Sequence, residues 1–172
     1  IISFTKILGQ LIGSGNTVTL SHYLKLLDQA GLLAGIEKYS ATTIRQRSSS
    51  PKFQVHNTAL ISAQRNETLQ MVAARPDLLG RMVESSIGAH LLNHSLTQEY
   101  RLYYWRDRND EVDYVLEKKG DIIGLEVTIG ETHKRRGMQA FQNRYHPKKV
   151  LMVGKSGIPW QDFLAINPGE LF

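Results

Sequence analysis

Two acidic side chains fall at opposed positions of a predicted β-hairpin. Segments 111–117 and 122–129 both alternate apolar and polar residues, a pattern typical of β-strands. A two-residue turn at 119–120 would fix the strand register and set Asp113 directly opposite Glu126. Opposed Cβ atoms on neighbouring strands lie about 5 Å apart, so the two carboxylates would share one site.

The two faces of this hairpin differ in chemistry. One face is predicted to be apolar, with Val112, Tyr114, Leu116, Ile123, Leu125, Val127 and Ile129. The other carries Glu111, Asp113, Val115, Glu117, Ile122, Gly124, Glu126 and Thr128, with four carboxylates and no Lys or Arg. The second face is either a solvated surface or a site for a cation, because like charges in direct opposition destabilise a sheet. Two carboxylates completed by water suit a hard ion such as Mg²⁺ or Mn²⁺.

The hairpin is embedded in a pattern that predicts an α/β domain. A helix is expected from Pro76 to about His94, with Leu79, Val83, Ile87 and Leu91 on its buried face. Strands are expected at 100–106, 111–117, 122–129 and 149–153, and a helix at 134–145. Glu84 follows Val83 on the long helix and is either an ordinary exposed acid or a third member of the acidic site.

The N-terminal part predicts a winged helix, that is, helices followed by a hairpin. Apolar spacing indicates helices over 1–13 and 20–30, with Thr19 as N-cap and Gly31 after the last turn. Strands are expected at 32–47 and 52–57. The division predicted from these patterns is a winged-helix-like domain at 1–57 and an α/β domain at 58–172.

A basic segment follows the second hairpin strand. Residues 133–149 contain no acid and six basic residues, which are Lys134, Arg135, Arg136, Arg144, Lys148 and Lys149. This segment is either a solvated helix face or a phosphate-binding flank of the acidic site. On the winged helix, Ser21, His22 and Lys25 could contact DNA phosphates, although such modules also pack against proteins.

The amino-acid composition excludes several kinds of site and protein class. The 172 residues include 21 Lys and Arg, 16 Asp and Glu, and no Cys, so disulfides and thiolate metal sites are excluded. No apolar run is long enough for a membrane span, and no signal-peptide pattern opens the chain. We expect a cytoplasmic protein, and the initial Ile1 suggests a piece of a longer one.

The order of several short motifs resembles a bacterial and archaeal family of AAA-type ATPases with a C-terminal nuclease-like domain. The motifs are Gly80-Arg-Met-Val-Glu84, Tyr104-Trp-Arg-Asp, Glu111-Val-Asp-Tyr-Val and Leu125-Glu-Val-Thr128. Tyr23 to Leu33 resembles the family's winged-helix signature, and Ser50-Pro-Lys52 resembles the start of one of its strands. His56-Asn57-Thr58 departs from the Asp and Gly usual in the family.

The resemblance implies a restriction-endonuclease-like fold of the PD-(D/E)XK type. In that core Glu84, Asp113 and Glu126 match the acidic positions that hold Mg²⁺ or Mn²⁺. The position of the nucleophile-orienting lysine is taken by Thr128, and Lys134 is the nearest substitute along the chain. Because threonine supplies no positive charge, the sequence predicts impaired or absent cleavage.

The resemblance also implies an ATPase module outside this chain. Val153-Gly-Lys-Ser156 resembles the end of a P-loop, but Lys149 stands where the motif needs its first glycine, so no Walker A motif is present. Any ATP would bind to the absent N-terminal module. Three functions follow as alternatives: a domain that binds nucleic acid with impaired or no cleavage, an active Mg²⁺-dependent DNA endonuclease, and a protein-interaction or regulatory module of the ATPase. Assembly into a homo-oligomer is left open.

Overall fold

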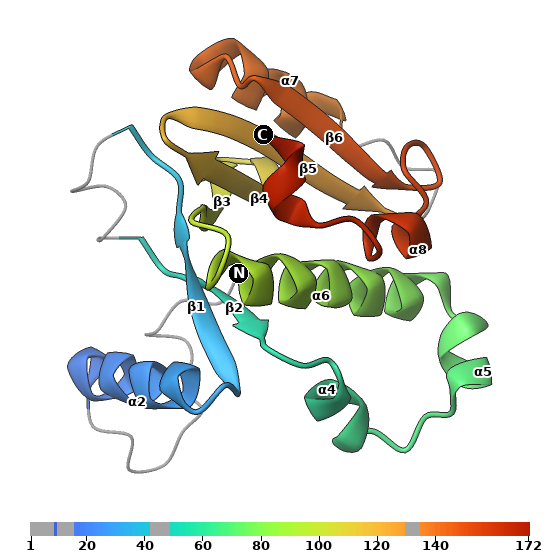
Figure 1. The fold of residues 1–172 in the computed structure, drawn as a ribbon. Coiled ribbons are helices and arrows are strands. Elements are labelled where there is room, and N and C mark those ends of the chain that lie inside the picture. The colour runs from blue at the N-terminus through green and yellow to red at the C-terminus, as the bar shows by residue number, and fades with distance from the viewer. Residues whose placement is uncertain (1–8, 10–15, 42–48, 130–134) are drawn as a thin grey trace.

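The fold is mixed α/β, as the sequence predicts, and its centre is a six-stranded mixed sheet (Figure 1). The computed structural model describes residue 9 and residues 16–41, 49–129 and 135–172. The strand order is β2-β1-β3-β4-β5-β6. The strands are β1 (Leu33–Lys38), β2 (Lys52–Val55), β3 (Arg101–Asp107), β4 (Asp110–Lys118), β5 (Asp121–Thr128) and β6 (Lys149–Gly154).

Two helices cover opposite faces of the sheet. The long helix α6 (Pro76–Ser95) packs against β2, β3 and β5, while α7 (Arg135–Tyr145) packs against β4 and β5. Pro76 at the start of α6 suits the first helical turn, where a backbone N–H is not needed. The remaining helical elements are α2 (Thr17–Gln29), α4 (Ala59–Ala63), α5 (Leu69–Ala73), α8 (Trp160–Phe163) and the 3₁₀ helix η1 (Pro168–Leu171).

The hydrophobic core has two parts, one on each face of the sheet. On the α6 side Val83, Ile87 and Leu91 meet Leu125 and Val127, as the predicted stripe requires. On the other side, Met138 and Phe141 of α7 join a second cluster with Tyr103, Trp105, Val112 and Val115. Gly124 allows this close approach, because a Cβ atom there would lie 3.1 Å from the Phe141 ring.

The predicted hairpin register is confirmed next to the turn, but the paired residues end before the predicted Asp113–Glu126 pair. Lys118 pairs with Asp121, and the pairing continues in step to Tyr114 and Leu125. Lys119 and Gly120 form the turn between β4 and β5, with φ of 53° and 92°. Positive φ at both turn positions is the geometry of the two-residue turns that match strand twist.

The predicted division of faces is wrong at one point, because β4 carries a bulge. The register of β3 against β4 shifts at Tyr104, so this residue lies opposite both Asp113 and Tyr114. A bulge inserts one extra residue and reverses the side-chain alternation beyond it. Val112, predicted to share a face with Tyr114, therefore packs in the α7-side cluster, whereas Tyr114 belongs to the α6-side core.

The N-terminal described region is a helix followed by an antiparallel pair of strands. Helix α2 begins after Asn16, whose side chain accepts the N–H groups of Val18 and Thr19, so the predicted cap at Thr19 is three residues too late. Gly31, with φ of 68°, follows the helix end as predicted. Residues 1–8, 10–15 and 42–48, which include the predicted first helix and part of the predicted first strand, lie outside the described residues.

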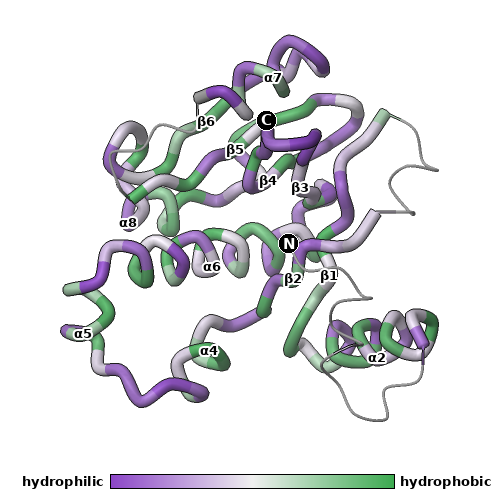
Figure 2. The backbone as a smooth tube through the Cα atoms, turned by 180° about the vertical axis from the view of Figure 1, so that it is seen from behind, coloured by the Kyte–Doolittle hydropathy of each residue, from purple (hydrophilic) through white to green (hydrophobic). Residues whose placement is uncertain are grey.

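Helix α2 differs from α6 and α7 in its packing. None of its residues is buried, and Val18, Tyr23, Leu26 and Leu27 are exposed. Figure 2 shows apolar and polar stretches alternating along α2, which lies beside β1 and apart from the other two helices. In the described ranges, no helix is both long and apolar enough to cross a bilayer.

Candidate functional site

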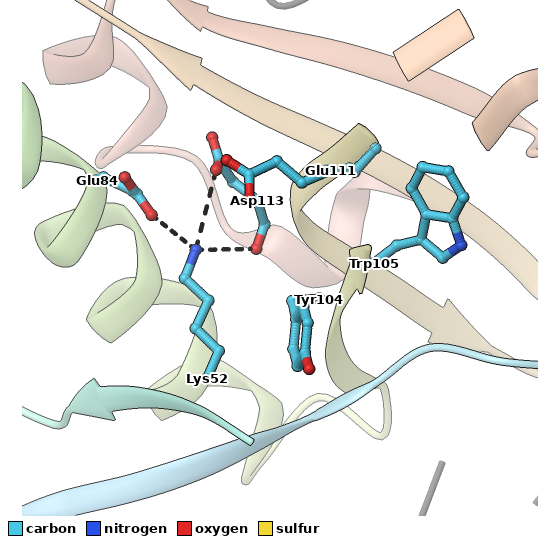
Figure 3. A pocket seen from close by; sticks show the side chains of 7 residues that line it. Lys52, Glu84, Tyr104, Trp105, Glu111 and Asp113 are labelled. Carbon is cyan, nitrogen blue, oxygen red and sulfur yellow. Dashed lines mark hydrogen bonds and ion pairs between the residues drawn. The ribbon is translucent and has the colours of Figure 1, made fainter. Parts of the chain in front are cut away.

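A pocket on the α6 side collects residues from four elements. It is lined by Lys52 of β2, Glu84 of α6, Tyr104 and Trp105 of β3, and Glu111, Val112 and Asp113 of β4. Figure 3 shows the Lys52 amine between the Glu84 and Asp113 side chains. The structure thus brings Glu84 and Asp113 together as predicted, and adds a lysine that the sequence did not place there.

Lys52 holds several negative groups at once. Its Nζ donates to Glu84 Oε1 at 2.6 Å and to the backbone oxygen of Asp113 at 3.2 Å, and lies 3.9 Å from Asp113 Oδ1. The amine also lies 4.3 Å from the centre of the Tyr114 ring. With only 16% of its side chain exposed, Lys52 makes a partly desolvated ion pair, which is stronger than one on an open surface.

The second Asp113 oxygen binds the neighbouring strand. Asp113 Oδ2 accepts the backbone N–H of Val127 at 2.9 Å, and the Asp113 side chain is 4% exposed. The bulge at Asp113 and Tyr114 directs this carboxylate between β4 and β5 while leaving its other oxygen near Lys52. Asp113 is therefore fixed from both sides by a backbone donor and an ammonium group.

Tyr114 packs against the Lys52 amine and links three elements next to the pocket. Its hydroxyl donates to Glu84 O at 2.9 Å and lies 3.1 Å from Gln54 Oε1. Burial raises the pKa of Tyr114 well above its ordinary value, and the negative charges of Glu84 and Asp113 raise it further. The hydroxyl consequently stays protonated and remains a donor.

The side chains of Glu126 and Thr128 lie on the other face of the sheet. Leu125 and Val127 belong to the α6-side core, so alternation along β5 puts Glu126 and Thr128 on the α7 side. Glu126 is fully buried. Thr128 Oγ1 is buried and finds no hydrogen-bond partner among the described residues. The predicted acidic trio is thus divided, because Glu126 is not among the residues that line the Lys52 pocket.

Three of the predicted phosphate-binding residues form ion pairs with acidic neighbours. Arg136 pairs with Asp110 at 3.0 Å, Arg144 with Asp107 at 2.6 Å and Lys148 with Asp121 at 2.7 Å. Lys149 donates to the backbone oxygen of Leu171. The Arg136 side chain is 84% exposed, and surface pairs of this kind contribute about 0–1 kcal/mol, so phosphate could replace the carboxylate at little cost.

The other residues predicted to contact nucleic acid lie on separate parts of the chain. Lys25 is exposed on α2, where it borders a shallow depression with Thr17, Val18, Ser21 and His22. Lys134 lies outside the described residues, and Arg135 is the first residue of α7. Helix α2 packs against β1, whereas α7 packs against β4 and β5, so Lys25 and Arg136 belong to different parts of the sheet (Figure 1).

The described residues do not make a ready metal site. Among them, no group of three or more His, Cys, Asp or Glu side chains is arranged to hold an ion. Glu84 and Asp113 are ligands of the type that Mg²⁺ prefers, but the Lys52 amine lies between them. The residues present therefore do not fit a resident divalent cation in this arrangement.

Comparison with known proteins places the chain in a family. Residues 79–168, just over half of the chain, match the sequence model of a domain of unknown function, DUF4143. The chain belongs to the DUF4143 family. Proteins that carry the DUF4143 domain are associated with AAA-type ATPases, which agrees with the broader part of the resemblance. No curated protein and no solved structure matches the chain.

Lys52 is the site residue that sequence reasoning missed. It precedes the DUF4143 match by 27 residues and lies on β2, so no local spacing connects it to Glu84 or Asp113. The only signal in the sequence was the Ser50-Pro-Lys52 motif, which resembles the start of a family strand but carries no implied role.

Proposed function

We propose that this chain is the C-terminal region of an AAA-type ATP-binding protein, and that its α/β domain binds nucleic acid with little or no cleavage. In this proposal residues 1–57 act as a winged helix and residues 58–172 as a restriction-endonuclease-like domain of the PD-(D/E)XK type. ATP would bind only to the absent ATPase module. The DUF4143 match supports the link to an ATPase.

The observation that carries the proposal is the Lys52 amine between Glu84 and Asp113. Hydrolysis of a phosphodiester by acidic residues requires a cation that positions water and stabilises phosphate charge. An ammonium group bound to the acids neutralises them without offering an open coordination position. This argues for a nuclease-like pocket that does not turn over rapidly.

Nucleic-acid binding is supported by the basic residues near this pocket. Arg136 borders a second depression that shares Glu111 with the Lys52 pocket. Arg106 and Arg108 are exposed in and beside the β3–β4 turn, close to the Asp107–Arg144 pair. Phosphates lying along this edge would exchange weak surface ion pairs for contacts with a polyanion.

The test is a salt titration of binding to labelled duplex DNA, followed by fluorescence anisotropy. Replacing Lys134, Arg135 and Arg136 with Ala should weaken binding and lower the log–log salt slope by about 0.9 for each phosphate that is no longer bound. A matched control replaces three arginines of the α4–α6 region, Arg65, Arg75 and Arg81, with Ala. The same reduction of net charge there should change the slope little.

Cleavage is tested separately by a plasmid-nicking time course with Mn²⁺. We expect little or no product from the unaltered chain. Robust cleavage that disappears in Asp113→Ala would instead establish an active endonuclease. Lys134→Ala and Lys52→Ala would then test which lysine supplies the positive charge that Thr128 lacks.

A protein-interaction module is the second candidate, and the packing of α2 favours it. An amphipathic helix with no buried residue, and with Val18, Leu26 and Leu27 exposed, is typical of a surface that receives a partner. DNA affinity and salt slope that are unchanged in both triple variants would favour this candidate over nucleic-acid binding.

A further inference from the structure

The acidic pocket is completed by a residue from outside the family domain. Glu84 and Asp113 lie within the 79–168 match, whereas Lys52 arrives on β2, which joins the sheet only through β1. Gln54, two residues further along β2, reaches the same region by donating to Ser85 O at 2.8 Å. The charge state of the pocket therefore depends on where β2 lies.

The Lys52 amine makes close contacts with its neighbours in the pocket. Its 2.6 Å contact to Glu84, its contact to the Asp113 backbone oxygen and the Tyr114 ring beneath it together hold the ammonium group on three sides. Cation–π contact and charge-assisted hydrogen bonds both strengthen when water is excluded. Lys52 is also the sole basic residue among the described residues that line this pocket.

A divalent cation and this ammonium group would compete for the same oxygens. A metal ion bound by Glu84 and Asp113 would lie within about 4 Å of the Lys52 nitrogen, where like charges repel strongly in a partly desolvated site. Without Lys52, the same pocket would hold Glu84, Asp113 and Glu111 and would carry excess negative charge. In the present arrangement the ammonium group already takes a carboxylate oxygen of Glu84 that a divalent cation would need.

We propose that Lys52 is a built-in counter-ion, an autoinhibitory contact that keeps divalent cations away from Glu84 and Asp113 while β2 is docked. The inference deepens the proposed function, because it gives a cause for the weak cleavage expected of this pocket. It also makes metal access dependent on the β1–β2 pair. Displacing β2 would remove the lysine from both carboxylates at once.

The first experiment compares Mn²⁺ binding in the whole chain by isothermal titration calorimetry. Lys52→Met keeps the apolar stem of the side chain but removes its charge, and should bind Mn²⁺ at least about tenfold more tightly than the unaltered chain. Adding Asp113→Asn should abolish that gain. Lys119→Met is the matched control, since it removes one charge from an exposed position in the turn between β4 and β5 and should leave Mn²⁺ affinity unchanged.

A second measurement needs no variant and covers the case in which Lys52→Met does not fold. Acetylation of lysines in the unaltered chain, read by mass spectrometry, should label Lys52 slowly, and saturating Mn²⁺ should accelerate its labelling while leaving that of Lys148 unchanged. The proposal is overturned if Mn²⁺ binds equally well with and without the Lys52 charge, if no variant binds it, or if bound Mn²⁺ leaves Lys52 labelling unaltered. The DNA salt titration is a separate readout, so failure of nucleic-acid binding would be distinguishable from failure of this contact.

Discussion

The hydroxyl of Tyr114 joins three elements through one buried atom. It contacts Gln54 of β2 and the backbone of Glu84 on α6, while the ring belongs to β4. Tyr114→Phe should lower the free energy of unfolding by about 1–3 kcal/mol, because buried polar atoms would be left without their partner. Urea denaturation measures the change, and Tyr23→Phe on the surface of α2 is the control, expected near zero. A decrease in Tyr114→Phe no larger than that of the control would show that these hydrogen bonds add no net stability.

His90 predicts a pH dependence of stability. Burial lowers the pKa of His90 and nearby His94 lowers it further, while its hydrogen bond to Ile166 O opposes the shift. The unfolded chain therefore binds this proton more readily, and the free energy of unfolding should fall as pH drops below about 6.5. Chemical denaturation between pH 7.5 and 5.5 measures the slope, which should flatten in His90→Gln. An equal slope in exposed His146→Gln and in His90→Gln would contradict this assignment.

For single residues, local sequence patterns predicted pairs within the hairpin but not the presence of Lys52 in the pocket. The two-residue turn at Lys119 and Gly120 predicted the pairs from Lys118–Asp121 to Tyr114–Leu125 correctly, but not the Asp113–Glu126 pair beyond them. Lys52 is separated from Asp113 by 61 residues and meets it only after β1 has joined β3. A contact of that separation leaves no periodicity in the sequence for a local rule to read.

Among the elements, α7 packs closely against the sheet because two positions are glycine. The two positions differ in how well they would accommodate a side chain. A Cβ atom at Gly137 would collide with the backbone oxygen of Glu111, whereas one at Gly124 would meet the Phe141 and Met138 side chains at 3.1–3.3 Å. Because backbone yields less than side chains, Gly137→Ala should cost more stability than Gly124→Ala, whose expected cost is about 1–3 kcal/mol. Thermal unfolding of both variants tests the order. The reverse order would mean that α7 can shift away from β4.

The bulge shows why element faces are harder to predict than element positions. The predicted ranges of β4, β5 and α6 agree with the structure within one or two residues, since alternation and helical spacing are local. One extra residue at Asp113 and Tyr114 is invisible in that alternation, yet it reverses the face of Val112. The bulge also directs the Asp113 side chain towards Lys52. Strand β5 has no bulge, so its regular alternation keeps Glu126 on the opposite face of the sheet.

For the whole molecule, the sheet crosses the domain boundary predicted at residues 57 and 58. β1 pairs with β3, and Lys52 and Gln54 bind α6 and β4, so the two regions should unfold together. We expect coincident thermal transitions from Trp fluorescence, which reports on Trp105 and Trp160, and from far-UV circular dichroism, which also reports on α2. A separate earlier transition in circular dichroism alone would support two independent domains at the predicted boundary.

The parallel pairing of β1 with β3 has a consequence for the order of folding. The hairpins of β3, β4 and β5 close over short turns, but Glu37 reaches its partner Tyr103 only across an intervening stretch that contains α4, α5 and α6. Closing such a long loop is slow, and during synthesis β1 and β2 leave the ribosome well before the strand they must join. We expect the acids of the pocket to assemble first and their lysine to arrive last, so a newly made chain passes through a stage in which that pocket is still uncovered.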